Sequence, residues 1–231
     1  MNSRLKIGMI DSGIIQAEQH KITDSAAFII QNKQLIQAPA QTDQLGHGTE
    51  LWKITHQAAP TANYYIAQVF QQRLSTTPHQ VAAAIEWLIF QKVQLINLSL
   101  GLATPSPILA ELCQQAQAEG IFLIATNPSC GEPVYPAAYP NMIRVTGDAR
   151  CQKGEIAYLN TSHAEFGAHV YSDKENIRGA SVAGAYVTAH FAKQWQSEIS
   201  YKTWLAHARE NVNYKGVEKV EERKREEGRR S

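Results

Sequence analysis

The sequence predicts an α/β fold of three layers, in which a mainly parallel β-sheet carries helices on both faces. Short apolar runs typical of buried strands alternate with helical stretches through residues 5–195. The helical stretches are long enough to join parallel strands by right-handed crossovers. The chain has 231 residues, of which 44% are hydrophobic, so it can build one domain with a sizeable core.

Five apolar runs are expected to form strands of this sheet. The first run is followed by Asp11, Ser12 and Gly13, a sequence typical of a turn. Helical stretches separate most of the runs, which favours parallel pairing. The runs are residues 5–10, 63–70, 93–100, 121–126 and 142–147.

Helices are expected between and after these strands. One begins with Thr77 and Pro78, which are favoured as the N-cap and the first helical residue. Another ends on Gly120, a residue type favoured just beyond a helix C-terminus. The four helical stretches are residues 77–92, 106–120, 181–195 and 200–212.

The globular domain is expected to span residues 1–212. From Lys215 onward nearly every residue is charged, with both signs mixed and no apolar face. Such a segment buries too little apolar surface to offset the entropy lost on ordering. We therefore expect residues 213–231 to form a flexible tail.

Composition argues against several classes of protein. The net charge of +1 gives no overall field that would attract nucleic acid. The three cysteines, Cys113, Cys130 and Cys151, have neither the spacing of a disulfide framework nor that of a zinc site. The sequence contains no signal peptide and no apolar run long enough to span a membrane. We expect a cytoplasmic protein with reduced thiols, no metal and no other cofactor.

Three short segments carry the residues of a charge-oriented nucleophile. Asp11 lies in IGMIDSG, His47 between glycines in LGHGTEL, and Ser181 among small residues in RGASVAGA. A serine is barely nucleophilic until a neutral imidazole accepts its proton, and a carboxylate holds that imidazole in the required tautomer. Taken singly, Asp11 could be a turn cap, His47 an ordinary structural histidine and Ser181 a helix N-cap.

The order of these segments resembles that of the subtilisin-like serine proteases, or subtilases, in a compact form. VQLINLSLG resembles their substrate-binding strand, IFLIATNPS the strand that delivers the oxyanion-hole asparagine, and VYPAAYPNMIRVTG the segment that follows. The resemblance covers residues 5–195 and implies a subtilisin-like fold with a catalytic domain over residues 1–212. It implies that Asp11, His47 and Ser181 form a catalytic triad.

The resemblance also implies residues that contact the substrate. Asn127 would donate its side-chain amide to the oxyanion, although asparagine at a strand end is commonly a turn residue. Residues 97–101 would pair with an extended peptide, unless they form an ordinary core strand. Val134 at the floor of the pocket predicts a preference for small or medium apolar side chains before the cleaved bond. The walls of this pocket are expected from Ser99, Leu100, Gly101, Ala125 and Thr126.

The chain departs from the family pattern at three positions. Ala180 replaces the threonine before the nucleophile, Ala185 replaces a proline in the following helix, and Glu50 replaces a second histidine. No acidic loop indicates a calcium site. Because Asp11 lies close to residue 1, no folding propeptide is expected. None of these differences removes a member of the triad.

We expect a serine endopeptidase that forms an acyl-enzyme at Ser181 and acts on a restricted substrate, such as a precursor peptide. Two alternatives stay open: a peptide ligase or macrocyclase on the same scaffold, and a non-catalytic subtilase-like module that binds peptide. The expected partners are a peptide or protein substrate and an activating or substrate-delivering protein. Nucleic acid and membrane are not expected partners.

Overall fold

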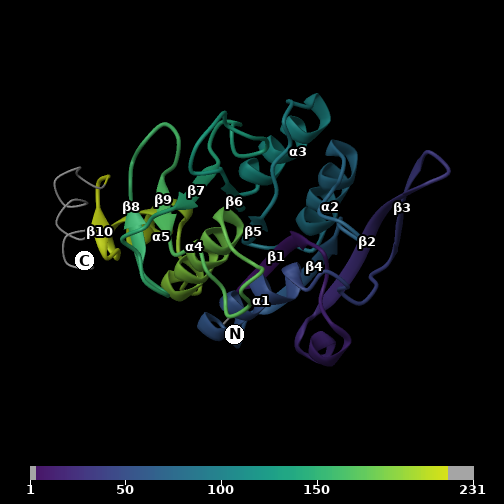
Figure 1. Cartoon of the computed structure of the whole chain (residues 1–231), viewed down its shortest axis with the longest axis horizontal. Helices are drawn as coiled ribbons and strands as arrows, with labels where there is room; N and C mark the ends of the chain where they lie inside the picture. Colours follow the sequence, from purple (N-terminus) through teal and green to yellow (C-terminus); the bar gives the residue numbers. More distant parts are fainter. Residues whose placement is uncertain (1–3, 218–231) are drawn as a thin grey trace.

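A computed structural model describes residues 4–217 of the chain (Figure 1). Within this range ten strands form one sheet, in the order β10-β8-β9-β7-β6-β5-β1-β4-β2-β3. Neighbouring strands are parallel except in the pairs β2–β3 and β8–β9, which confirms the mainly parallel sheet. The strands are β1 (Lys6–Asp11), β2 (Asp24–Gln31), β3 (Gln34–Pro39), β4 (Asn63–Gln68), β5 (Leu95–Leu98), β6 (Phe122–Thr126), β7 (Ile143–Gly147), β8 (Ile156–Tyr158), β9 (Phe166–Ala168) and β10 (Tyr214–Lys215).

Helices cover both faces of this sheet, as predicted. In the described range these are α1 (His47–Ala58), α2 (Pro78–Phe90), α3 (Pro107–Ala118), α4 (Ala180–Gln194) and α5 (Tyr201–Glu210), with a 3₁₀ helix, η1 (Gln16–Lys21). Figure 1 shows α2 and α3 on one side of the sheet and α1 and α4 on the other. Each side has its own apolar core: Ile7 and Met9 of β1 face the core with α1 and α4, whereas Ile10 faces the core with α2 and α3.

The predicted helix ends have the expected local chemistry. The Thr77 hydroxyl accepts a hydrogen bond from Gln80 N, and the Gln80 side chain accepts one from Thr77 N, so a capping box begins α2. Gly120 follows α3 with a φ of +78°, a conformation that glycine adopts without strain. These two helices therefore begin and end where the sequence places them, within two residues.

The β2–β3 hairpin and helix α1 are among the elements that were missed, because their local signals are weak. The β2–β3 hairpin turns at Asn32 and Lys33, which both have positive φ angles, 52° and 64°. Such a turn normally carries glycine, so the sequence gives no clear hairpin signal here. Helix α1 begins at His47 without a serine, threonine, aspartate or asparagine at its N-cap, which is Gly46.

The C-terminal boundary lies further along the chain than the sequence predicts. Tyr214 and Lys215 form β10, which pairs with β8 at the edge of the sheet. Asn213 fixes this strand, since its side chain accepts a hydrogen bond from Ile156 N and its backbone N–H donates to Ile156 O. Residues 213–216 are thus hydrogen-bonded to the edge of the sheet, and residues 218–231 of the predicted tail lie outside the described residues. No helix within residues 4–217 is long and apolar enough to span a membrane.

The topology gathers the segments of interest at one edge of the sheet. Asp11 is the last residue of β1, and residues 99–101 follow the neighbouring strand β5. Asn127 follows β6, which pairs with β5 on its other side. The carboxyl ends of adjacent parallel strands are where sites form in open α/β sheets.

Candidate active site

Asp11 lies in a tight turn that buried polar groups hold in place. The residue is 1% exposed, and its Oδ1 accepts a hydrogen bond of 2.7 Å from Ser12 N. Gln68 of β4 donates to Ser12 O across 2.7 Å. Gly13 has a φ of +100°, which the turn needs and which a residue with a side chain rarely adopts. The turn-cap alternative for Asp11 is therefore present, but it uses the same oxygen that contacts His47.

His47 is the first residue of α1, and the glycines beside it allow α1 to approach the Asp11 turn. A Cβ atom on Gly48 would lie 2.6 Å from Gly13 O, closer than any side chain tolerates. With no side chain there, Gly48 N donates to the Ser12 hydroxyl across 2.8 Å. The close approach that the sequence attributes to these glycines is a feature of the structure.

Asp43 was not predicted, and it organises the start of α1. This buried carboxylate accepts hydrogen bonds from Leu45 N and Gly46 N through Oδ1, at 3.0 and 2.8 Å. Through Oδ2 it accepts from the backbone N–H and the hydroxyl of Thr49, at 2.9 and 2.7 Å. Asp43 thereby fixes the backbone on both sides of His47. The only feature of the sequence that could have indicated this role is the position of the aspartate, four residues before the glycine-flanked His47.

Ser181 is the second residue of α4, so the N-cap alternative is wrong. The N-cap is Gly179, whose φ of +108° brings the chain into the helix. The small residues that follow allow α4 to pack against the strand ends. A Cβ on Gly184 would lie 2.6 Å from the Thr126 methyl group and 3.4 Å from the Asn97 side-chain oxygen.

The three side chains that the sequence singles out meet at this edge. His47 Nδ1 lies 2.7 Å from Asp11 Oδ1, and His47 Nε2 lies 3.2 Å from Ser181 Oγ. Both distances are within hydrogen-bond range, the first for a base and its orienting carboxylate and the second for a base and its nucleophile. The ring is held between a buried acid and a serine hydroxyl, with its two nitrogens in different roles.

The charges around His47 favour the protonated form of its imidazole. Burial of the imidazole opposes its charged form, but the charge of Asp11, its hydrogen bond and the charge of Asp43 act in the other direction. The net effect raises the pKa of His47 above its ordinary value. The ring is thus a stronger base than a free histidine, which suits it to accept a hydroxyl proton.

Asn127 is buried just after β6 and lines neither of the two cavities near Ser181, and contacts within the fold engage its amide group. Its Nδ2 donates to His163 O across 2.8 Å, and its Oδ1 accepts from Val134 N across 3.2 Å. These partners fix which end of the amide carries the N–H groups. One N–H of the amide is used by His163 O, which leaves the second for another acceptor.

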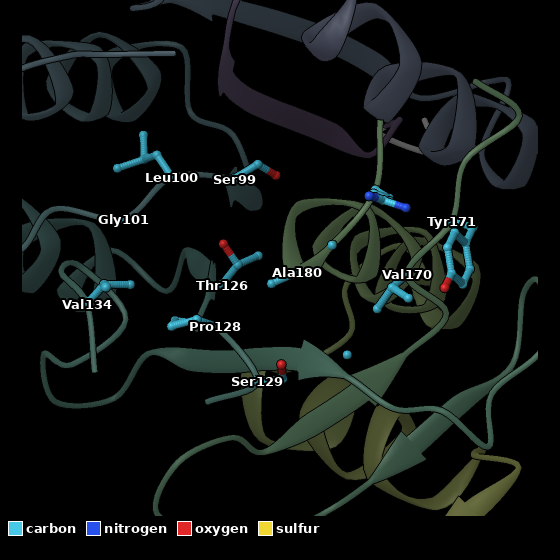
Figure 2. A pocket seen from close by; sticks show the side chains of 13 residues that line it. Ser99, Leu100, Gly101, Thr126, Pro128, Ser129, Val134, Val170, Tyr171 and Ala180 are labelled. Atoms are coloured by element: carbon cyan, nitrogen blue, oxygen red, sulfur yellow. The ribbon is translucent and has the colours of Figure 1, made fainter. Parts of the chain in front are cut away.

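A cavity of about 640 Å³ is lined by Gly179 and Ala180, the two residues that precede Ser181, and Figure 2 shows Ala180 in its wall. Five of the six predicted pocket residues line it: Ser99, Leu100, Gly101, Thr126 and Val134. Val134 stands against Gly101, because a Cβ on this glycine would lie 2.7 Å from a methyl carbon of Val134. The valine therefore narrows this end of the cavity.

Ala125 is the exception among the predicted pocket residues. Its side chain is fully buried in the core with α2 and α3 and does not line the cavity. Successive residues of a strand point to opposite faces, so only one of Ala125 and Thr126 can face this site. The sequence did not predict the other lining residues, which come from the segment after Asn127, the end of β7 and the segment before Ser181: Pro128, Ser129, Gly147, Val170, Tyr171, Arg178, Gly179 and Ala180.

A second cavity, of about 430 Å³, shares a wall with the first. His47 and Ser181 line it, together with Phe70, Leu74 and other residues of the loop that follows β4. Residues 99–101 line both cavities, so they form a continuous wall past the serine hydroxyl. An extended peptide laid along this wall would pass Ser181.

Neither a metal site nor a reactive thiol is part of this arrangement. Residues 4–217 contain no cluster of three or more histidine, cysteine, aspartate or glutamate side chains placed to hold a metal ion. All three cysteines are free, and burial raises the pKa of Cys113 and Cys151 to about 12. Ser181, whose hydroxyl contacts His47 Nε2, is the candidate nucleophile of this edge.

The fold and the site together define a class of protein. A mainly parallel sheet with helices on both faces, carrying an Asp-His-Ser arrangement in this chain order, is the architecture of the subtilisin-like serine peptidases. The family model described as the Subtilase family matches residues 2–219. The chain belongs to the Subtilase family.

Several characterised relatives are similar in sequence. The minor extracellular protease Epr of Bacillus subtilis is 27% identical over 202 residues, covering 81% of this chain and 29% of that protein. A thermostable alkaline protease of Halalkalibacterium halodurans is 28% identical over 204 residues, covering 81% of this chain and 54% of that protein. The chain thus matches only 29% and 54% of the length of these two relatives.

Two solved structures share the fold. The prenylagaramide maturation protease PagA is 20% identical, with a TM-score of 0.59, over 82% of this chain and 74% of that chain. The protease domain of PatA is 16% identical, with a TM-score of 0.61, over 83% of this chain and 79% of that chain. At these identities the likeness concerns the fold.

Proposed function

We propose that the protein is a serine endopeptidase in which Ser181 is the nucleophile, His47 the general base and Asp11 the group that orients His47. The observation that carries this proposal is the contact of His47 with both partners, 2.7 Å to Asp11 Oδ1 and 3.2 Å to Ser181 Oγ. A non-catalytic peptide-binding module would have no need for a buried carboxylate behind the imidazole.

The proposed reaction proceeds in two halves. Ser181 Oγ attacks the carbonyl carbon of the scissile bond while His47 Nε2 accepts the hydroxyl proton. The tetrahedral intermediate collapses when His47 returns this proton to the leaving amine, and an ester to Ser181 remains. A water molecule then attacks the ester while His47 accepts its proton, and His47 passes this proton to Ser181 Oγ as the ester bond breaks and the acid product leaves.

The start of α4 and Asn127 would stabilise the oxyanion. Backbone N–H groups in the first turn of a helix lack acceptors within the helix, and the positive end of the helix dipole lies there. Ser181 is in this first turn. The second N–H of the Asn127 amide is the proposed further donor, and such a donor typically contributes about 10²–10³-fold in turnover.

The substrate is proposed to be an extended peptide with a small or medium apolar residue before the cleaved bond. The wall formed by residues 99–101 supports an extended peptide, and Val134 against Gly101 supports a shallow pocket. We infer further that the substrate is a precursor peptide. A solved structure of the same fold is described as a maturation protease.

The experiment is incubation of the protein with a proteome-derived peptide library, followed by mass spectrometry. New termini that form with the wild-type protein and not with Ser181→Ala support the proposal. Joined or cyclised products in place of hydrolysed ones would make the protein a ligase, because an amine would then replace water in the second half. Equal product patterns from the wild-type and Ser181→Ala proteins would overturn both enzymatic functions and leave the peptide-binding module. Cleavage that appears only after addition of cell extract would indicate an activating or substrate-delivering partner.

A further inference from the structure

We propose that Arg178 binds an acidic side chain of the substrate, on the leaving-group side of the scissile bond. This inference rests on the proposed peptidase function and adds a charge preference to it. It depends on three features of the cavity beside Ser181: its charge, the position of Arg178 and the way in which the cavity is divided.

Arg178 is the only charged residue among those that line the 640 Å³ cavity. Within residues 4–217 no ion pair and no side-chain hydrogen bond engages its guanidinium group. The other charged side chains of this loop include Asp173, which pairs with Lys153 across 2.6 Å. An unpaired arginine in a cavity without carboxylates is complementary to an anionic group of a ligand.

The backbone around Arg178 is held in place. Arg178 forms an antiparallel bridge with Tyr171, and Gly179 N donates to Val170 O across 2.7 Å. Arg178 is also only three residues before Ser181 in the sequence. A peptide that offers a carbonyl group to Ser181 therefore passes close to this arginine.

The cavity has two ends of different chemistry. Figure 2 shows Leu100, Gly101 and Val134 on one side, Val170 and Tyr171 on the other, and Ala180 between them. The first side is narrow and apolar, and it suits the residue before the cleaved bond.

The second side contains Tyr171 and, beside it on the bridge, Arg178. The proposal places the residue that follows the cleaved bond on this second side, because the apolar side suits the residue before that bond and an extended peptide continues past Ser181. A glutamate there can accept two parallel hydrogen bonds from the guanidinium group and carries the opposite charge. A glutamine has no charge and only one accepting oxygen.

The expected gain is moderate, because Arg178 is exposed at the rim of the cavity. Exposed charge pairs contribute little in water, and pairs with two parallel hydrogen bonds contribute more. We expect kcat/KM to be about tenfold higher for glutamate than for glutamine after the cleaved bond, which corresponds to about 1.4 kcal/mol.

The test uses short quenched fluorogenic peptides that differ only in having glutamate, glutamine or lysine after the cleaved bond. Wild type is expected to cleave them in that order of kcat/KM. In Arg178→Gln the ratio of glutamate to glutamine falls to about one, and in Arg178→Glu the lysine peptide becomes the best substrate. Arg4→Gln makes the same change of charge at an exposed position before β1, and its glutamate-to-glutamine ratio should equal that of wild type.

A binding measurement separates this inference from the peptidase proposal. Fluorescence anisotropy with labelled peptides on Ser181→Ala needs no chemistry. Tighter binding of the glutamate peptide, lost when Arg178→Gln is added, supports the inference even if wild type cleaves nothing. Cleavage by wild type with equal kcat/KM for glutamate and glutamine overturns the inference and leaves the peptidase standing. Equal binding of the three peptides, or none, likewise overturns it.

Discussion

The residues of the proposed relay come from three distant parts of the chain, and each depends on a local device. Asp11 needs the turn at Gly13, His47 needs the backbone that Asp43 fixes, and Ser181 needs the helix start after Gly179. Substitution of any of these supports should disturb the geometry without removing a reacting group. Asp43 is the clearest example of such a support. Its two carboxylate oxygens accept the hydrogen bonds from Leu45, Gly46 and Thr49 that hold the backbone around His47.

The pH dependence of activity is the first prediction at this scale. Only neutral His47 accepts a proton, so activity falls as pH falls through the pKa of His47. Asp11 raises that pKa, so the acid limb of the kcat/KM profile should lie above the ordinary histidine value of about 6.5. In Asp11→Asn the limb moves to lower pH and turnover drops by about 10⁴-fold.

The control for this profile is Asp24→Asn, which removes a carboxylate on the exposed part of β2. It should keep the wild-type limb and turnover. If Asp11→Asn has the acid limb of wild type, Asp11 does not set the basicity of His47 and the relay is wrong.

Asn127 allows a test of the oxyanion assignment. Asn127→Ala should lower kcat by about 10²–10³-fold and leave KM nearly as it is, because the oxyanion exists only after the attack of Ser181. A thermal melt checks the loss of the contacts with His163 O and Val134 N. A large rise in KM with wild-type kcat would instead mean that Asn127 only shapes the loop.

Val134 allows a test of pocket depth. Val134→Gly removes the side chain that stands against Gly101, so the preference before the cleaved bond should shift from alanine or valine toward phenylalanine. Val170→Gly opens the same cavity from its other side and is the matched control. If wild type already prefers phenylalanine before the cleaved bond, or if both variants shift this preference equally, Val134 does not form the floor of the pocket.

At the scale of elements, close packing of α4 on the sheet connects the stability of the fold to the position of Ser181. Gly184→Ala places a methyl group 2.6 Å from the Thr126 methyl and should cost about 1–3 kcal/mol. For a chain of this size that lowers Tm by several degrees, at about 2–4 °C per kcal/mol. Thr126→Ser removes the opposing methyl group, so the double variant should recover much of the Tm. No recovery would place the strain elsewhere in α4.

The elements that the sequence predicts are those with a strong local signal. Residues 5–10 and 121–126 are continuous apolar runs and appear as β1 and β6, and Thr77 and Gly120 mark real helix ends. The β2–β3 hairpin was missed because its turn lacks glycine. The short strands β8, β9 and β10 were missed because two or three residues carry no recognisable pattern, and pairing with neighbours in the sheet forms them.

At the scale of the whole molecule, the site exists because the sheet order places β1, β5 and β6 side by side. Their carboxyl ends bring together segments that are more than 100 residues apart in the sequence. Motifs predict which residues have the required chemistry, and five of the six residues predicted for the pocket line one cavity. Residues such as Val170, Tyr171 and Arg178 were not found, because only the folded chain brings their loop against the strand ends.

The most direct test of the proposed relay is covalent labelling of the native protein with a serine-directed phosphonate, with the adduct located by mass spectrometry of its peptides. The phosphorus should be found on Ser181 in wild type, no adduct should form in Ser181→Ala, and labelling should be far slower in His47→Ala. An unlabelled native protein, or an adduct on another serine whose formation does not depend on His47, would contradict the account.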